Sequence, residues 1–96
     1  MSQHVHDVLQ RVHDRASFVE FVFALGDDFA DEKEKERESP SPPFGPGANG
    51  WENGTIDAFL FAAAQWAADY DAVGSSEWPN PWQFCAQVLY MGKIYE

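Results

Sequence analysis

The sequence predicts an all-α protein, a small four-helix domain with a long disordered loop between the second and third helices. Apolar residues recur at helical spacing in four stretches, and residues typical of helix caps stand near their starts. Between the second and third stretches, residues 31–50 are acidic and then rich in proline and glycine. We therefore expect one helical domain over residues 1–96, with 31–50 a flexible acidic and Pro/Gly-rich loop.

The first two helices are expected close together near the N-terminus. From Gln3 to His13, one apolar stripe follows the i, i+3, i+4, i+7 spacing and contains Val5, Val8, Leu9 and Val12. The second helix is expected to start at Ser17, which has the capping-box spacing with Glu20. Its main stripe contains Phe18, Phe21, Val22, Leu25 and Phe29, whereas Val19 and Phe23 lie roughly opposite. This helix is therefore predicted to be apolar on two sides.

The loop is expected to have two parts of different composition. Residues 31–38 read DEKEKERE, and i,i+4 charge pairs could prolong the second helix through them, but they contain no apolar side chain to bury. Residues 39–50 read SPSPPFGPGANG, with four prolines and three glycines. Proline removes backbone donors and disrupts helices and central strands, so we expect a mobile, solvated connection.

The hook WENGT, residues 51–55, leads into the most apolar run of the chain. Thr55 is expected to cap the third helix, and Asp57 suits the positive end of its dipole. Trp51 is expected to fold back on the first turn, and Asn53 to stabilise the bend. The helix is predicted over 56–70, with a core-facing stripe of Ile56, Phe59, Leu60, Ala63, Trp66, Ala67 and Tyr70. We interpret the hook mainly as a helix entrance, and Phe61 points away from the stripe.

The fourth helix is expected to follow a connection at 71–80. Asn80 is the predicted cap, Pro81 occupies the first helical position, and Gly92 is expected to end the helix at the C′ position. Apolar residues lie on two sides, Trp82, Cys85, Ala86 and Leu89 on one and Phe84, Val88 and Met91 on the other. Cys85 is expected to be a small buried hydrophobic residue without reactivity.

The charge balance excludes several classes of partner. With 16 acidic against 6 basic residues, the formal net charge is −10. We therefore expect no nucleic acid partner, since no basic patch is available to neutralise phosphates, and no anionic membrane surface. The N-terminus has no apolar signal region, and no apolar run is long enough to span a bilayer. A cytoplasmic location is the expectation.

Three stretches resemble a family of small bacterial proteins described as a domain of unknown function. They are SFVEFVFAL (17–25), WENGTIDAFLFAAAQW (51–66) and WQFCAQVLYMGKIYE (82–96), together 40 of the 96 residues. The most specific parts are the Trp-Glu-Asn-x-Thr-Ile helix entry and the Gly-Lys-x-Tyr-Glu C-terminus. The resemblance implies a bacterial, cytoplasmic setting and carries over no activity.

The sequence contains no pattern that indicates catalysis, so we expect a protein that is not an enzyme and needs no cofactor. His6 and His13 would lie about 10 Å apart along a helix, too far to share a metal ion, and no His pair has i, i+4 spacing. No glycine-rich phosphate loop or nucleophile elbow is present. No catalytic, cofactor-binding or metal-binding residue is therefore assigned.

Surplus aromatic residues suggest a binding surface. Phe23, Phe61 and Phe84 lie off the main stripes, and we favour their partial exposure over complete burial. The hypothesis is an interaction module that binds another protein, or a second copy, through an apolar aromatic patch with an acidic rim. The expected partner-binding residues are Phe23, Phe61, Phe84, Trp51, Glu52 and Tyr95. An immunity protein that neutralises a toxin is one concrete version.

Two alternatives stay open. The first is a small ligand-binding or enzymatic domain with a site around Trp51, Glu52, Asn53 and Tyr95. It requires the C-terminal tail to return beside the hook, where Lys93 would join a polar cluster. The second is a structural protein that only forms homodimers.

Overall fold

The computed structural model describes residues 2–43, 45–70 and 80–95. Over this part of the chain it shows four α-helices and no strand. The helices are α1 (Ser2–Gln10), α2 (Arg15–Glu38), α3 (Ile56–Tyr70) and α4 (Pro81–Ile94). The predicted all-α class is confirmed, and so are the bounds of the third helix. The predicted connection at 71–80 lies, apart from Asn80, outside the described residues.

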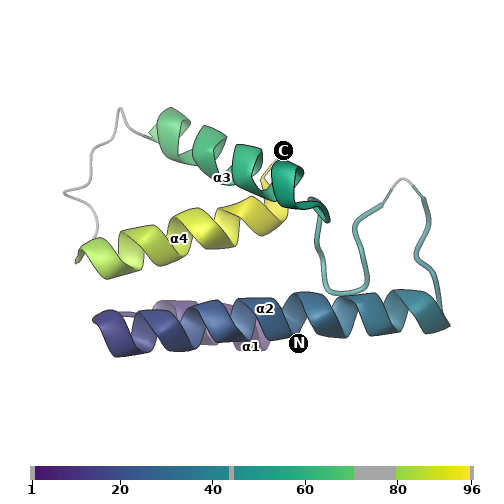
Figure 1. Cartoon of the computed structure of the whole chain (residues 1–96), viewed down its shortest axis with the longest axis horizontal. Coiled ribbons are helices and arrows are strands. Elements are labelled where there is room, and N and C mark those ends of the chain that lie inside the picture. The colour runs from purple at the N-terminus through teal and green to yellow at the C-terminus, as the bar shows by residue number, and fades with distance from the viewer. Residues whose placement is uncertain (1, 44, 71–79, 96) are drawn as a thin grey trace.

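Helix α4 is the central element of the fold. It packs against α3, α2 and α1, whereas α3 packs mainly against α4 (Figure 1). Helix α1 lies alongside α2. The connection from α2 to α3 leaves the end of α2, returns to its surface and then enters α3, which brings the start of α3 beside the C-terminus (Figure 1). Helices α2 and α3 are therefore held apart by α4 rather than packed together.

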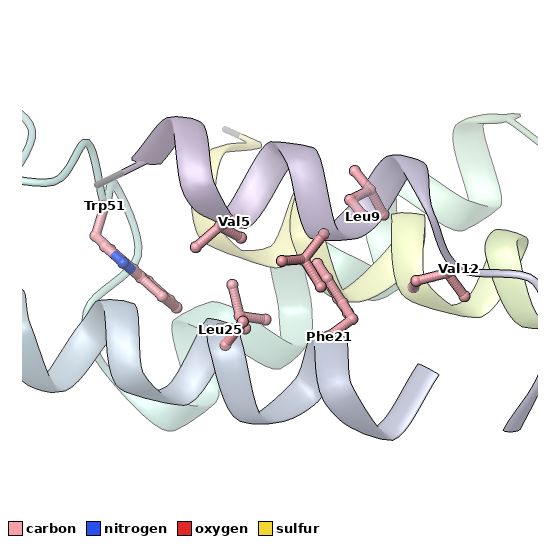
Figure 2. Packing of buried hydrophobic residues seen from close by; sticks show 9 residues of the cluster. Val5, Leu9, Val12, Phe21, Leu25 and Trp51 are labelled. Atoms are coloured by element: carbon pink, nitrogen blue, oxygen red, sulfur yellow. The ribbon is translucent and has the colours of Figure 1, made fainter. Parts of the chain in front are cut away.

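The core lies where α1 meets α2 and α4. Val5 and Leu9 on α1 point toward Phe21 and Leu25 on α2, and Trp51 adds to this cluster from the connection (Figure 2). The stripe predicted for the first helix is confirmed, since Val5, Val8, Leu9 and Val12 are all at most 3% exposed. The helix itself ends at Gln10, earlier than predicted, and Val12 lies in the turn that follows.

Helix α2 begins earlier than the predicted start at Ser17. Asp14 is the N-cap, and its carboxylate accepts a hydrogen bond from the Ser17 amide at 2.9 Å. The Ser17 hydroxyl in turn accepts from the Asp14 amide at 3.1 Å. Ser17 is thus the N3 partner of a capping box rather than its cap, because Asp14 offers the stronger, charged acceptor. The Ser17 hydroxyl also donates to the Asp14 carboxylate, and this bond, followed by the bond from the Ser17 amide, lowers the pKa of Asp14.

Helix α2 also continues to Glu38, so the loop predicted over 31–50 is wrong over 31–38. The prediction of a solvated loop is wrong at Asn49 too, which is only 4% exposed. The physical reason is that acids on one face of α2 accept hydrogen bonds from the returning chain. Glu32 accepts from the amide of Asn49 at 2.9 Å, and Glu36 accepts from the amide of Ala48 at 2.8 Å.

Helix α4 begins as predicted and ends later. The Asn80 side chain accepts from the Gln83 amide at 2.8 Å, and Pro81 takes the first position. Gly92 does not end the helix, which runs on to Ile94. Gly92 is instead required by packing, because a Cβ there would lie 2.9 Å from the Phe59 ring and 3.0 Å from its carbonyl oxygen.

The prediction that Cys85 is buried is wrong, since its side chain is exposed. Its neighbour Ala86 faces the core and is 0% exposed. Helical periodicity places adjacent residues about 100° apart, so the two cannot share one buried face equally. The smaller side chain takes the close helix contact.

Candidate functional site

An open apolar groove lies between α2, the hook and α3. Its volume is about 440 Å³, and α4 contributes Leu89 to its lining. Helix α2 supplies Val22 and Phe29, and α3 supplies Ile56 and Leu60. Trp51 and Phe59 also line it. We call this the α2–α3 groove.

A second hollow extends this surface along α2. It also measures about 440 Å³ and is lined by Phe18, Val19, Val22, Phe23, Gly26 and Asp27. Val22 and Gly26 belong to both hollows, so the apolar surface is continuous along the helix. Asp27 is the single charged residue in the lining of either hollow. The surface therefore follows the helix and has an acidic group on its edge.

The groove is open because α3 packs on α4 instead of on α2. Its side chains are consequently exposed, Val22 by 41%, Leu60 by 55% and Ile56 by 80%. The stripe predicted for the third helix assigned Ile56 and Leu60 to the core, and this is wrong; Val22 belongs to the main stripe predicted for the second helix. Neighbouring positions on the same stripes, Phe21 and Ala63, are 0% and 5% exposed. Each apolar stripe is wider than the part of it that neighbouring helices cover. The apolar residues left uncovered at its edge form the groove.

One wall of the groove is fixed by a buried ion pair. The Lys93 ammonium lies 2.8 Å from the Asp28 carboxylate, and the two side chains are 1% and 2% exposed. The Trp51 indole N–H donates to the same Asp28 oxygen at 2.9 Å. The Lys93 ammonium also lies 5.6 Å from the centre of the Trp51 ring. We call Asp28, Lys93 and Trp51 the Asp28 cluster.

Trp51 is thereby held beside two other aromatic residues. Its ring centre lies 4.7 Å from that of Phe29 and 6.0 Å from that of Phe59. Both separations fall in the range of favourable tilted aromatic pairs. Burial, and then the negative charge of Asp28, raises the pKa of the Tyr90 phenol. The cluster therefore joins α2, the hook and α4 into a rigid base for the groove.

The hook is also tied to the end of α4, as expected for a tail that returns beside it. The Asn53 amide group donates to the carbonyls of Gly92 at 3.0 Å and Tyr95 at 2.8 Å. The Glu52 backbone N–H donates to the Lys93 carbonyl at 2.9 Å. Asn53 therefore satisfies helix-end carbonyls rather than stabilising its own turn. Thr55 caps α3 as predicted, accepting from the Ala58 amide at 3.3 Å.

The predicted partner-binding residues do not all line the two hollows. Phe23 and Phe61 are 72% and 74% exposed, but Phe23 lines the hollow on α2 whereas Phe61 lines neither hollow. Phe84 is half-buried, with its ring centre 6.2 Å from that of Trp66.

Trp51 is only 8% exposed and lines the groove. Glu52 is exposed beside it. Tyr95 donates its hydroxyl to Asp69, and this bond raises the pKa of Tyr95 and lowers that of Asp69. The four residues of the alternative ligand site are thus close in the fold. The side chains of Asn53 and Tyr95, however, already form hydrogen bonds with other residues of the chain.

Several carboxylates of the described residues accept hydrogen bonds, and these bonds lower their pKa values. The pKa of Asp31 is lowered by hydrogen bonds from Asn49 and Lys35, and that of Glu36 by hydrogen bonds from Ser41 and then Ala48. The pKa of Asp57 falls through its bond with Thr55. Within the described ranges, no three His, Cys, Asp or Glu side chains gather as a metal site would require. The search of the same residues finds no helix with the length and apolarity of a membrane span.

The comparison with protein families identifies the family to which the chain belongs. The family of unknown function DUF7660 matches residues 14–96. The chain belongs to this family. The DUF7660 match covers α2, the hook, α3 and α4, and therefore every residue that lines the groove. It leaves out α1, although α1 supplies much of the core. Neither the curated proteins nor the solved structures gave a match.

Proposed function

We propose that the chain is a non-enzymatic protein-interaction module that binds another protein through the α2–α3 groove. The observation that supports this is the exposure of Val22, Ile56 and Leu60 around one continuous apolar hollow. Contiguous apolar surface is uncommon on a small soluble monomer and marks places where partners dock. The proposal includes the cytoplasmic, bacterial setting that the resemblance implies.

The wall of the groove favours binding over chemistry. The Asp28 carboxylate and the Lys93 ammonium neutralise each other in the interior, so neither faces the groove as a free acid or base. The polar groups that do border it, Asn53 and Thr55, donate or accept within the helix ends. A rigid apolar surface without a free titratable group suits a docking site.

A small apolar ligand is the second candidate. The groove volume of about 440 Å³ lies within the range of small-molecule sites, roughly 300–1,000 Å³. Such sites bury most of their ligand, however, and here Ile56 is 80% exposed at the edge. We therefore place the protein partner first. An immunity protein is one form of this function, and homodimerisation stays an alternative.

A comparison of two surface variants tests the proposal. The tagged full chain, the double variant Val22→Glu with Leu60→Glu, and the control Phe61→Glu would each be purified from the source cells. All three changed positions are exposed, so the fold is expected to survive, as circular dichroism would verify. We expect one partner to be retained by the wild type and the control and lost from the groove variant. Retention of the same partner by the groove variant would refute docking in the groove.

A further inference from the structure

We infer that the occupant of the α2–α3 groove is a cationic amphipathic helix of a partner protein, which crosses α2 at Gly26. This inference rests on the proposed function and adds the chemistry of the partner. It follows from the shape of the exposed face of α2, from a glycine that the fold itself does not need, and from the charges beside the groove.

The exposed face of α2 has the form that a second helix packs against. Phe18, Val22 and Gly26 follow at four-residue intervals, which is the spacing of one surface ridge on a helix. The larger side chains border a low point at Gly26. The groove therefore offers a ridge with a notch, and a crossing helix fits into such a notch with its own side chains.

Gly26 is unexplained by the chain alone. It lies inside α2, where glycine is less favourable than alanine. A Cβ built at Gly26 would meet nothing within 4 Å, and its φ is not positive. Gly92 gives the contrast, since Phe59 occupies the space that a Cβ would need. The absence of a side chain at Gly26 leaves space on the open side of α2, where the backbone of a partner can approach closely.

Helical recognition is favoured over strand addition. An extended peptide adds to the free edge of a sheet, and the described residues contain no strand. An amphipathic helix instead lays its apolar face in a groove between helices. The two hollows that share Val22 and Gly26 run along α2 and provide the elongated apolar surface that this requires.

Charge selects a cationic partner over a second copy of this chain. Asp27 lines the hollow, Glu20 lies one side of Phe23 on the same helix, and Asp57 begins α3; all three are exposed. Two lysines lie near the lining: the ammonium of exposed Lys33 is 5.5 Å from the centre of the Phe29 ring, and Lys93 is buried and paired with Asp28. Each chain also carries a net charge of −10, so two copies repel each other. Lysine or arginine flanking the apolar face of the partner helix would match these edges.

Photo-crosslinking in the source cells tests the inference with the full chain. A benzophenone amino acid would replace Leu60 in the groove and, as the matched control, exposed Gln65 on the same helix. Mass spectrometry would then identify the linked segment. We expect Leu60 to link to a segment with apolar residues at i, i+3, i+4 spacing and a net positive charge, and Gln65 not to link to it.

The outcomes separate the inference from the proposed function. A link from Leu60 to an acidic segment, to a segment without helical spacing or to this chain itself would overturn the inference and leave a docking groove. A link to a small molecule, or no protein link at Leu60, would overturn both.

Affinity for the linked segment, made as a synthetic peptide, tests the crossing point. Gly26→Leu fills the notch and is expected to weaken binding by about tenfold or more, since an overfilled contact forces both surfaces to shift. Ala16→Leu changes an exposed alanine of α2 outside the groove and is expected to leave the affinity unchanged. Equal affinities for wild type and Gly26→Leu would overturn the crossing at Gly26.

Discussion

Lys93 and Asp28 form an ion pair inside the protein, with the ammonium 2.8 Å from the carboxylate and side-chain exposures of 1% and 2%. The pair joins the last turn of α4 to the middle of α2 across 65 residues of sequence. Trp51 donates to the same carboxylate oxygen, so the hook is fixed by the same contact. The position of α3 and the opening of the groove depend on this junction.

Breaking the pair on one side is expected to be costly. Lys93→Met leaves the Asp28 charge buried without its cation and should lower the free energy of unfolding by about 3–5 kcal/mol. The double variant with Asp28→Asn removes both charges and keeps an oxygen for the Trp51 indole. Urea denaturation should therefore find the double variant more stable than Lys93→Met alone. A double variant that is the less stable of the two would show that the unpaired Asp28 charge is not the cause of the loss in Lys93→Met.

The connection near the hook is expected to be protected from hydrogen exchange. The amides of Asn49 and Trp51 donate to the same Glu32 oxygen at 2.9 and 3.2 Å, and Glu32 is 6% exposed. Exchange at both amides should be slow in the wild type and much faster in Glu32→Ala. Glu34→Ala, an exposed change on the same helix, is the control and should leave both rates unchanged. Fast exchange in the wild type would show that 47–51 is as mobile as the sequence suggests.

Acid should release the connection from α2. Hydrogen bonds from Ser41, and then Ala48, hold the pKa of Glu36 below its ordinary value. A lowered pKa in the folded state means that the stabilising contribution is present above the unfolded-state pKa and is lost as the pH falls through the folded-state pKa. Carboxyl chemical shifts in an NMR titration should show Glu36 titrating below the ordinary range, and Ser41→Ala should move its pKa upward. An unchanged pKa in Ser41→Ala would mean that these bonds are absent in solution.

Two glycines on different helices should respond in opposite directions to alanine. Gly92→Ala places a methyl group 2.9 Å from the Phe59 ring and is expected to destabilise the fold by about 1–3 kcal/mol. Gly26→Ala meets nothing within 4 Å and should stabilise the free protein by about 0.5–1 kcal/mol through higher helix propensity. Thermal unfolding of both variants checks the pair. A destabilised Gly26→Ala would mean that the fold itself needs this glycine.

Local sequence signals predict much of the fold. Asn80 and Pro81 mark the start of α4, Thr55 marks that of α3, and the spacing of Val5, Val8, Leu9 and Val12 identifies the buried side of α1. Each signal depends on residues within a few positions of one another, so composition and spacing are sufficient. The match to DUF7660 likewise confirms the resemblance to a family of unknown function.

The errors arise where distant segments decide the outcome. The run DEKEKERE is polar, yet Glu32 becomes buried because the amides of Asn49 and Trp51 reach it from beyond the proline-rich stretch. Lys93 suits a helix end by sequence, but its partner is Asp28 rather than the helix dipole. The available signal was a set of acidic residues four positions apart on one face of the helix. This spacing does not indicate which hydrogen-bond donors the carboxylates will meet.

The candidate site was missed for the same reason. Val22, Ile56 and Leu60 belong to stripes that are apolar throughout, and only the packing of α3 on α4 determines which members stay uncovered. The off-stripe phenylalanines drew attention to exposed aromatic surface, and Phe23 does line the hollow on α2. Phe61 lines neither hollow. Sequence periodicity predicted that surplus apolar surface exists but could not locate it.

The groove itself can be observed directly in the methyl spectrum of the full chain with and without its co-purified partner. We expect the methyl signals of Val22, Ile56 and Leu60 to shift on binding, while those of Val5 and Val8 on the buried side of α1, and of Val12 in the turn after it, stay in place. Shifts confined to other surfaces, with the groove methyl signals unchanged, would contradict docking in the α2–α3 groove.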